Sequence, residues 1–154
     1  MATSRYHHGE LRPALIAAAM AALDTQGELP SWRALARACN VSHTAPYRHF
    51  SSYEDLQAAV ASECFRRLAA SIDAERSLPK DPFDRLRAGS AAYIAFGRRH
   101  PAWYRLMFEH VNATDETRQA GAAAYATLVD AIATCGVRDP FPIAAGVWAG
   151  QHGV

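Results

Sequence analysis

Residues 31–50 contain two stretches of helical character separated by a sharp turn, and this pattern constrains the fold more than any other part of the chain. The stretch reads Ser-Trp-Arg-Ala-Leu-Ala-Arg-Ala-Cys-Asn-Val-Ser-His-Thr-Ala-Pro-Tyr-Arg-His-Phe. Ser31 predicts an N-cap for the first helix, and Asn40 is a residue type that tolerates a left-handed backbone. Ser42 predicts the cap of a second helix, with Pro46 near its first turn. The pattern is that of a helix-turn-helix, whose second helix can enter the major groove of DNA.

The charge of this segment is positive, although the whole chain is close to neutral. No acidic residue lies between Glu28 and Glu54, while Arg33, Arg37 and Arg48 are present. The formal net charge of the 154 residues is +1. Because DNA carries dense phosphate charge, a local patch without carboxylates favours binding more than the total charge does.

The rest of the chain also follows helical spacing, and no segment alternates polar and apolar residues as a strand does. Half of the residues are hydrophobic, which is enough for a packed core. We therefore predict an all-α protein of about eight helices. The expected helices cover residues 10–26, 31–39, 42–50, 53–77, 82–99, 103–109, 114–135 and 143–154.

Breaks in the helical pattern predict the domain organisation. Two prolines make residues 78–82 the clearest interruption of the chain. We expect an N-terminal helix-turn-helix DNA-binding domain at residues 1–52 and a helical ligand-binding and dimerisation domain at residues 53–154. The three cysteines are far apart and form neither a disulfide framework nor a metal knuckle, which favours a reducing compartment.

No stretch approaches the roughly 20 apolar residues that a membrane-spanning helix needs. Residues 15–23 are apolar and follow two arginines, as in a secretory signal, but they lack a clear cleavage context and predict a buried helix instead. We therefore expect a cytoplasmic protein without membrane association.

Several segments carry a pattern beyond helical spacing. They are Tyr6-His-His-Gly-Glu-Leu-Arg12, Leu35-Ala-Arg-Ala-Cys-Asn-Val-Ser42, and Tyr47-Arg-His-Phe50 shortly before Glu54. On these segments the chain resembles the one-component transcription regulators of the TetR (TetR/AcrR) type. His100-Pro-Ala-Trp-Tyr-Arg-Leu-Met-Phe108 and Trp148-Ala-Gly-Gln-His-Gly153 resemble the subgroup whose regulatory domain ends in a Trp…His-Gly (WHG-like) signature.

The resemblance implies a three-helix DNA-binding domain that a fourth helix joins to a ligand-binding, dimerising domain. It further implies a homodimer, most often a repressor, that binds an inverted-repeat operator on double-stranded DNA and is released by a small-molecule effector. Members usually carry a lysine at the position of Tyr53, so the tyrosine predicts an uncharged, weaker and less salt-sensitive phosphate contact. Members commonly have further helices after the point where this chain ends. The resemblance therefore implies either a truncated product or a dimer interface that is built differently.

The candidate DNA contacts lie in the helix-turn-helix and at its flanks. Base edges are usually read from the start of the recognition helix, where a histidine can donate or accept and a methyl group can meet thymine. Arg48 either holds a phosphate or guanine, or pairs with Glu54 or Asp55. Arg5 either reaches the minor groove or belongs to a tail that is disordered without DNA. The candidates are Arg5, Ser31, Arg33, Ser42, His43, Thr44, Ala45, Tyr47, Arg48, His49 and Tyr53.

The C-terminal half supplies a set of large, mostly aromatic side chains that could line a ligand pocket. Apolar cavities between the helices of a bundle are common ligand sites, although more than half of such residues are expected to be ordinary core. The candidates are Tyr93, Phe96, Trp103, Met107, Phe108, Tyr125 and Trp148.

No residue pattern points to catalysis or to a metal. His7 and His8 are neighbours in sequence and cannot share a helix face, so we expect no metal site and no cofactor. We find no nucleophile–base arrangement, paired-carboxylate motif or glycine-rich phosphate loop, and we predict that the protein is not an enzyme. The alternative to a DNA-binding regulator is a helical small-molecule sensor or carrier with little or no DNA binding.

Overall fold

The computed structural model describes residues 11–78, 80–110 and 113–152, which form seven α-helices and one short 3-10 helix, with no strand among these residues. The predicted all-α class is confirmed. None of the described helices combines the length and the apolar character that crossing a bilayer requires. The elements in chain order are α1 (Leu11–Gln26), α2 (Trp32–Ala38), η1 (Pro46–Arg48), α3 (Tyr53–Arg76), α4 (Pro82–Arg99), α5 (Pro101–Glu109), α6 (Asp115–Ala133) and α7 (Pro140–His152).

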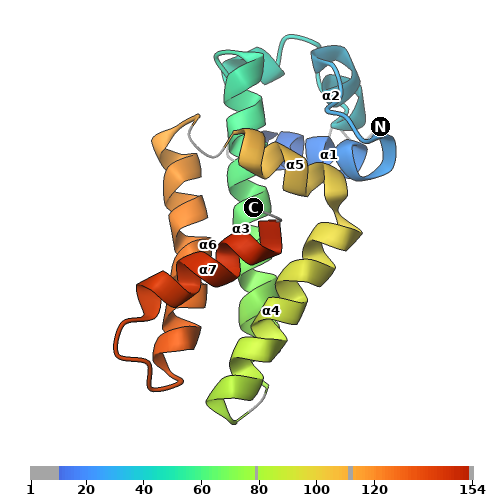
Figure 1. Cartoon of the computed structure of the whole chain (residues 1–154). Coiled ribbons are helices and arrows are strands. Elements are labelled where there is room, and N and C mark those ends of the chain that lie inside the picture. The colour runs from blue at the N-terminus through green and yellow to red at the C-terminus, as the bar shows by residue number, and fades with distance from the viewer. Residues whose placement is uncertain (1–10, 79, 111–112, 153–154) are drawn as a thin grey trace.

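The long helix α3 runs through the centre of the molecule (Figure 1). The helices α1 and α2 gather at one end of α3, while α4, α6 and α7 lie around its other half and α5 lies close to α1. Buried side chains recur along α3 at helical spacing, so this one helix packs against the helices at both ends of the molecule. They include Leu56, Val60, Cys64, Phe65, Leu68 and Ile72.

Side-chain caps fix where the helices begin. Ser31 accepts a backbone N–H at the start of α2, which confirms the predicted cap, and Ser52 does the same for α3. Asp81 and Thr114 cap α4 and α6 in the same way. Each cap satisfies a backbone donor that has no partner within its helix.

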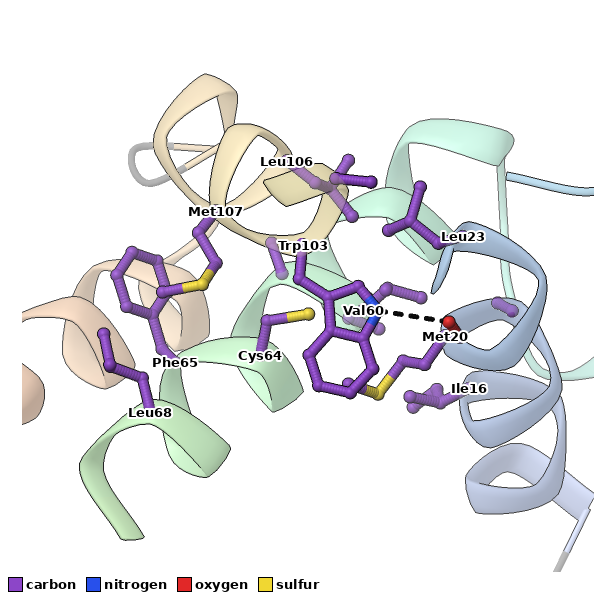
Figure 2. Close-up of a cluster of buried hydrophobic side chains, with 14 of the residues drawn as sticks. Ile16, Met20, Leu23, Val60, Cys64, Phe65, Leu68, Trp103, Leu106 and Met107 are labelled. Carbon is purple, nitrogen blue, oxygen red and sulfur yellow. Dashed lines mark hydrogen bonds between the residues drawn. The ribbon is translucent and has the colours of Figure 1, made fainter. Parts of the chain in front are cut away.

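Trp103 of α5 joins the C-terminal helices to α1 (Figure 2). Its indole N–H donates to the carbonyl oxygen of Met20 in α1 at 3.1 Å, and its side chain is buried. The ring of His100 stacks on the indole with centroids 4.0 Å apart, and His100 Nδ1 lies 2.8 Å from Asp24 Oδ1 in α1. Two polar contacts therefore tie the start of α5 to the C-terminal half of α1.

Candidate nucleic-acid interface and ligand cavity

The helix α2 ends in the sharp turn that the sequence predicts. Ser31 Oγ accepts the N–H of Ala34 at 3.3 Å and so begins the helix. At the other end Asn40 adopts a φ of 54°, which confirms the expected left-handed residue. The next N–H, of Val41, donates to the carbonyl of Ala36 at 2.9 Å and closes the helix end.

The second element of the helix-turn-helix is shorter than predicted. A helix over residues 42–50 was expected, and the structure has a single 3-10 turn at Pro46–Arg48. Ser42 does not cap it, because Ala45 holds the cap position without a side-chain hydrogen bond. Pro46 has no N–H to donate to the carbonyl of Ser42, which accepts instead from the N–H of Ala45 at 3.0 Å. The predicted helix is therefore wrong in type and in length.

Four side chains line one open hollow on the helix-turn-helix, and we call it the helix-turn-helix hollow. They are Trp32, Arg33, His43 and Tyr47. The guanidinium and the phenol are donors, and an imidazole can donate as well, so the hollow suits an anionic oxygen such as that of a phosphate. The further predicted contacts that are exposed around it are Ser31, Ser42, Thr44 and Arg48, and His49 is half-buried.

Trp32 supports the hollow and is absent from the predicted contacts. Its ring centroid lies 5.2 Å from that of Tyr47 and 5.6 Å from that of Tyr53, with Phe50 at 6.2 Å. Tyr47 itself is 58% exposed, so its ring has the Trp32 indole on one side and solvent on the other. The sequence does contain a signal for this role of Trp32. An aromatic residue directly follows the cap Ser31, and from this position its side chain reaches the second element of the helix-turn-helix.

Two predicted DNA contacts turn inward. The hydroxyl of Tyr53 donates to the carbonyls of Leu29 at 3.1 Å and Pro30 at 3.3 Å. Because a phenol has one hydrogen, the contact to a phosphate that we expected from Tyr53 would require this hydrogen bond to break. Burial, and then the charge of Glu28, raise the pKa of Tyr53. Ala45 packs against the core, so its methyl group does not face outward as a thymine contact requires.

Arg48 does not form the alternative ion pair. The carboxylate of Asp55 accepts the Ser51 N–H at 2.9 Å and the Ser51 hydroxyl at 3.2 Å. A hydrogen bond from its own backbone N–H, and then one from the Ser52 hydroxyl, lower the pKa of Glu54. The Asp55 carboxylate is thus bound at the start of α3, and the exposed guanidinium of Arg48 remains available to an anion.

A small apolar cavity lies among α3, α4, α6 and α7. Its volume is about 20 Å³, which is room for about one water molecule. Arg76 lies at its edge and donates to the carbonyl of Thr127 at 2.5 Å. Ligand pockets for drug-sized molecules hold about 300 Å³ or more, so this cavity would have to open to accept one.

Two of the predicted pocket residues, Tyr93 and Trp148, line this cavity. The hydroxyl of Tyr93 lies 3.1 Å from the hydroxyl of Tyr104. Phe108 and Tyr125 do not line the cavity but pack against the Trp148 ring, with centroids 6.1 and 5.4 Å away.

The other three predicted pocket residues lie elsewhere. Phe96 and Trp103 line a separate open groove between α3 and α4, and Met107 is fully buried in the core. Tyr93 and Phe96 are three positions apart, a spacing that predicts one buried face of α4. That face of α4 borders the cavity on one side and the open groove on the other. The spacing alone does not tell which of the two hollows each residue lines.

Some predicted features lie outside the described residues. These are Arg5, the histidine pair His7 and His8, and Gly153 of the C-terminal signature. Over the part of the chain that is described, no three His, Cys, Asp or Glu side chains gather closely enough to hold a metal ion.

Comparison with known families finds a match in the C-terminal part of the chain. A family model described as the C-terminal domain of tetracyclin repressor-like proteins matches residues 86–154. This segment includes most of α4 and all of α5, α6 and α7. No curated protein matches the chain.

Solved structures share the fold over nearly the whole chain. A protein of unknown function from Rhodococcus sp. RHA1 is 30% identical, with 97% of this chain and 83% of that chain covered and a TM-score of 0.84. A possible TetR family transcriptional regulator from Streptomyces coelicolor A3(2) is 21% identical, with 92% and 68% covered and a TM-score of 0.66. A TetR family transcription regulator from Marinobacter aquaeolei VT8 is 20% identical, with 94% and 85% covered and a TM-score of 0.61.

Proposed function

We propose that the chain is a transcription regulator of the TetR family and acts as a repressor that a small molecule releases from DNA. The family model over residues 86–154 and the fold shared with TetR regulators support this. Residues 1–52 bind the DNA, and residues 53–154 bind the effector and form a homodimer. The resemblance of the segment from Trp148 to Gly153 to the Trp…His-Gly signature supports placing the regulatory domain in that subgroup. The protein acts in the cytoplasm.

The helix-turn-helix hollow is the observation that carries the DNA-binding role. Arg33, His43 and Tyr47 converge there, and the exposed Arg48 lies on the same short element as Tyr47. No carboxylate stands in the sequence between Glu28 and Glu54 to neutralise them. Phosphate contacts of this kind fix the position of a protein on a duplex, and base contacts from the adjacent turn then select the sequence.

The operator follows from the symmetry of a homodimer. Two copies of one helix-turn-helix related by a twofold axis read two identical half-sites in opposite directions. The half-sites are then about one helical turn apart, roughly 34 Å, or a multiple of it. An inverted repeat is therefore the expected target.

The effector acts by preferring the conformation that does not bind DNA. A ligand shifts an equilibrium only by its difference in affinity for the two states. The cavity beside Tyr93 and Trp148 holds about one water in the present conformation, so a larger ligand selects a state in which α4, α6 and α7 move apart. Such a movement reaches α1 through the contacts of His100 and Trp103 at the start of α5.

The experiment measures the affinity of the protein for 30-base-pair duplexes of random sequence at several salt concentrations. Each phosphate contact contributes about one unit to the slope of log affinity against log salt. We expect the variant Tyr47→Phe with Arg48→Ala to bind more weakly and to have a slope smaller by about one. The control Arg87→Ala removes an exposed arginine of α4 and should leave the slope unchanged. An unchanged slope in the double variant would contradict the assignment of this surface.

A sensor or carrier without DNA binding is the second candidate, and the inward position of Tyr53 favours it. The family position that usually carries a phosphate-binding lysine here offers a hydroxyl that is already bonded to Leu29 and Pro30. If the protein binds no random-sequence duplex at low salt, the sensor or carrier is favoured, because phosphate contacts are strongest at low salt.

A further inference from the structure

A second hollow lies between α3 and α4, apart from the cavity beside Tyr93. Its volume is about 650 Å³ and it is open to solvent. Arg67 and Glu75 border it on α3, and Arg99 and Trp103 border the end where α4 meets α5. Arg67 lies at this same end, against the Trp103 ring. We call it the α3–α4 groove.

The α4 wall of the groove is lined with methyl groups. Ala88, Ala91, Ala92 and Ala95 all line it, and Ala91 and Ala95 are exposed. Alanine side chains are short, so the two helices leave a trough between their axes. Ala88 and Arg99 are about 16 Å apart along the helix, at about 1.5 Å of rise per residue. The trough therefore has the length and the apolar surface for an extended hydrocarbon chain.

The two ends of the groove carry opposite charge. At the α5 end, the Arg67 guanidinium lies 5.5 Å from the centroid of the Trp103 ring, and its Nε bonds Glu63 at 3.0 Å. Arg99 is exposed and forms no ion pair with any described carboxylate. Glu75 lines the groove farther along α3. An anionic group is thus attracted to the end with Arg99 and repelled from the end with Glu75.

We propose that the α3–α4 groove binds a free aliphatic carboxylate. The hydrocarbon chain lies along the alanines of α4, and the carboxylate meets Arg99 beside Arg67. One uncommitted guanidinium matches one negative charge, and a guanidinium can bond both oxygens of a carboxylate at once.

The site has a direct connection to the DNA-binding end. Trp103 and His100 border the groove, and they are the residues that contact Met20 and Asp24 of α1. An occupant that displaces either side chain therefore changes how α1 is held. This consequence for DNA affinity rests on the proposed function, whereas binding in the groove does not.

The binding experiment is calorimetric titration of the protein with decanoate, below its micelle concentration and without DNA. We expect one decanoate per chain, with affinity at least tenfold weaker in Arg99→Glu and in Ala95→Glu. The matched control Arg87→Glu should bind as the wild type does, because it changes a charge outside the groove. Ala95→Gln adds the same bulk as Ala95→Glu without its charge and should therefore weaken binding less than Ala95→Glu does. The uncharged 1-decanol should bind at least tenfold more weakly than decanoate.

A substitution in the cavity beside Tyr93 distinguishes binding in that cavity from binding in the α3–α4 groove. A methyl group added at Gly89 lies 3.4 Å from Ile72 Cγ2, an ordinary contact, so Gly89→Ala fills the cavity with little strain. Gly89→Ala should leave decanoate affinity unchanged. The proposal is overturned if Gly89→Ala weakens binding while Arg99→Glu does not, or if decanol binds as well as decanoate. It is also overturned if decanoate does not bind. If Ala95→Glu then converts a dimer to a monomer in sedimentation, the groove is covered by a second copy of the chain instead.

Coupling to DNA is measured separately. Decanoate is expected to change the affinity for random-sequence duplexes by at least threefold in the wild type and not in Arg99→Glu. An unchanged affinity would overturn the link to α1. A protein that binds decanoate but no DNA at all would contradict the proposed function and leave the groove site standing.

Discussion

Replacing Trp103 by phenylalanine tests how strongly the C-terminal helices hold α1. The phenyl ring can still pack against Phe96 and His100, whose ring centroids lie 6.0 and 4.0 Å from that of the indole. The substitution removes the indole N–H, and with it the 3.1 Å hydrogen bond to the carbonyl of Met20. It therefore weakens a defined contact between α5 and α1 while leaving the aromatic stack in place.

The expected loss of stability is about 2 kcal/mol. An intramolecular hydrogen bond contributes about 1 kcal/mol net. The smaller ring leaves unfilled space at a side chain that is only 6% exposed, which adds about 1 kcal/mol more. For a chain of this length a loss of about 2 kcal/mol lowers the unfolding temperature by roughly 4–8 °C.

Thermal unfolding followed by circular dichroism gives the stability, and hydrogen exchange of the α1 amides gives the local effect. Trp103→Phe should lower the unfolding temperature and speed exchange in α1 beyond the amount that the global loss explains. The control Trp148→Phe makes the same replacement in α7, where the ring packs on Tyr93 and Tyr125. If both variants changed α1 exchange equally, the account of Trp103 as the contact between α5 and α1 would be refuted.

Three further predictions concern single side chains. Tyr53→Phe should lower the free energy of unfolding in urea by about 1 kcal/mol, because the hydrogen bond to Leu29 and Pro30 is lost. It should change the affinity for duplex DNA less than twofold. A large loss of affinity would restore Tyr53 as a phosphate contact. Gly27→Ala should lower the free energy of unfolding by about 1 kcal/mol. Gly27 has a φ of 77° and no atom lies near an added methyl group, so the cost comes from the backbone angle alone. An unchanged unfolding temperature would contradict the left-handed cap. Burial raises the pKa of Cys64 from 9.0 to about 12. Since the folded thiol holds its proton where the unfolded thiol has lost it, this stability is complete below about pH 9 and is lost between about pH 9 and pH 12. Cys64→Ala should therefore lose less stability than the wild type over that range, and identical pH profiles in urea titrations would argue against the shift.

The helix ends were predictable because their signals are local. A cap such as Ser31 or Ser52 acts on a backbone N–H three residues away, and the turn at Asn40 depends on a property of that residue type. Neither requires knowledge of which distant segments meet. The same holds for the class of the fold, which follows from helical spacing throughout the chain.

The element after the turn was not predictable from the same signals. Ser42 has the chemistry of a cap, and a proline is often tolerated in a first turn. A helix of two turns has few hydrogen bonds, however, so the single bond that Pro46 cannot make decides between an α-helix and a 3-10 turn. The direction of Tyr53 depends in addition on the carbonyls of Leu29 and Pro30, which only the folded chain brings near.

The ligand cavity was predictable only in part for a geometric reason. Helical spacing identifies which face of α4 is buried, and it correctly includes Tyr93 and Phe96. It does not say that Tyr93 meets α6 and α7 across the cavity while Phe96 turns to the α3–α4 groove. Which helices pack on the two sides of α4 is a property of the tertiary fold.

Selection from a library of random duplexes, with the enriched sequences measured again at two salt concentrations, shows whether the protein recognises a DNA sequence as a dimer. We expect enrichment of an inverted repeat whose affinity for the protein falls steeply as salt rises, because a dimer would hold phosphates through Arg33, Arg48 and their neighbours. No enrichment at low salt would contradict it and would make the protein a helical sensor without a DNA target.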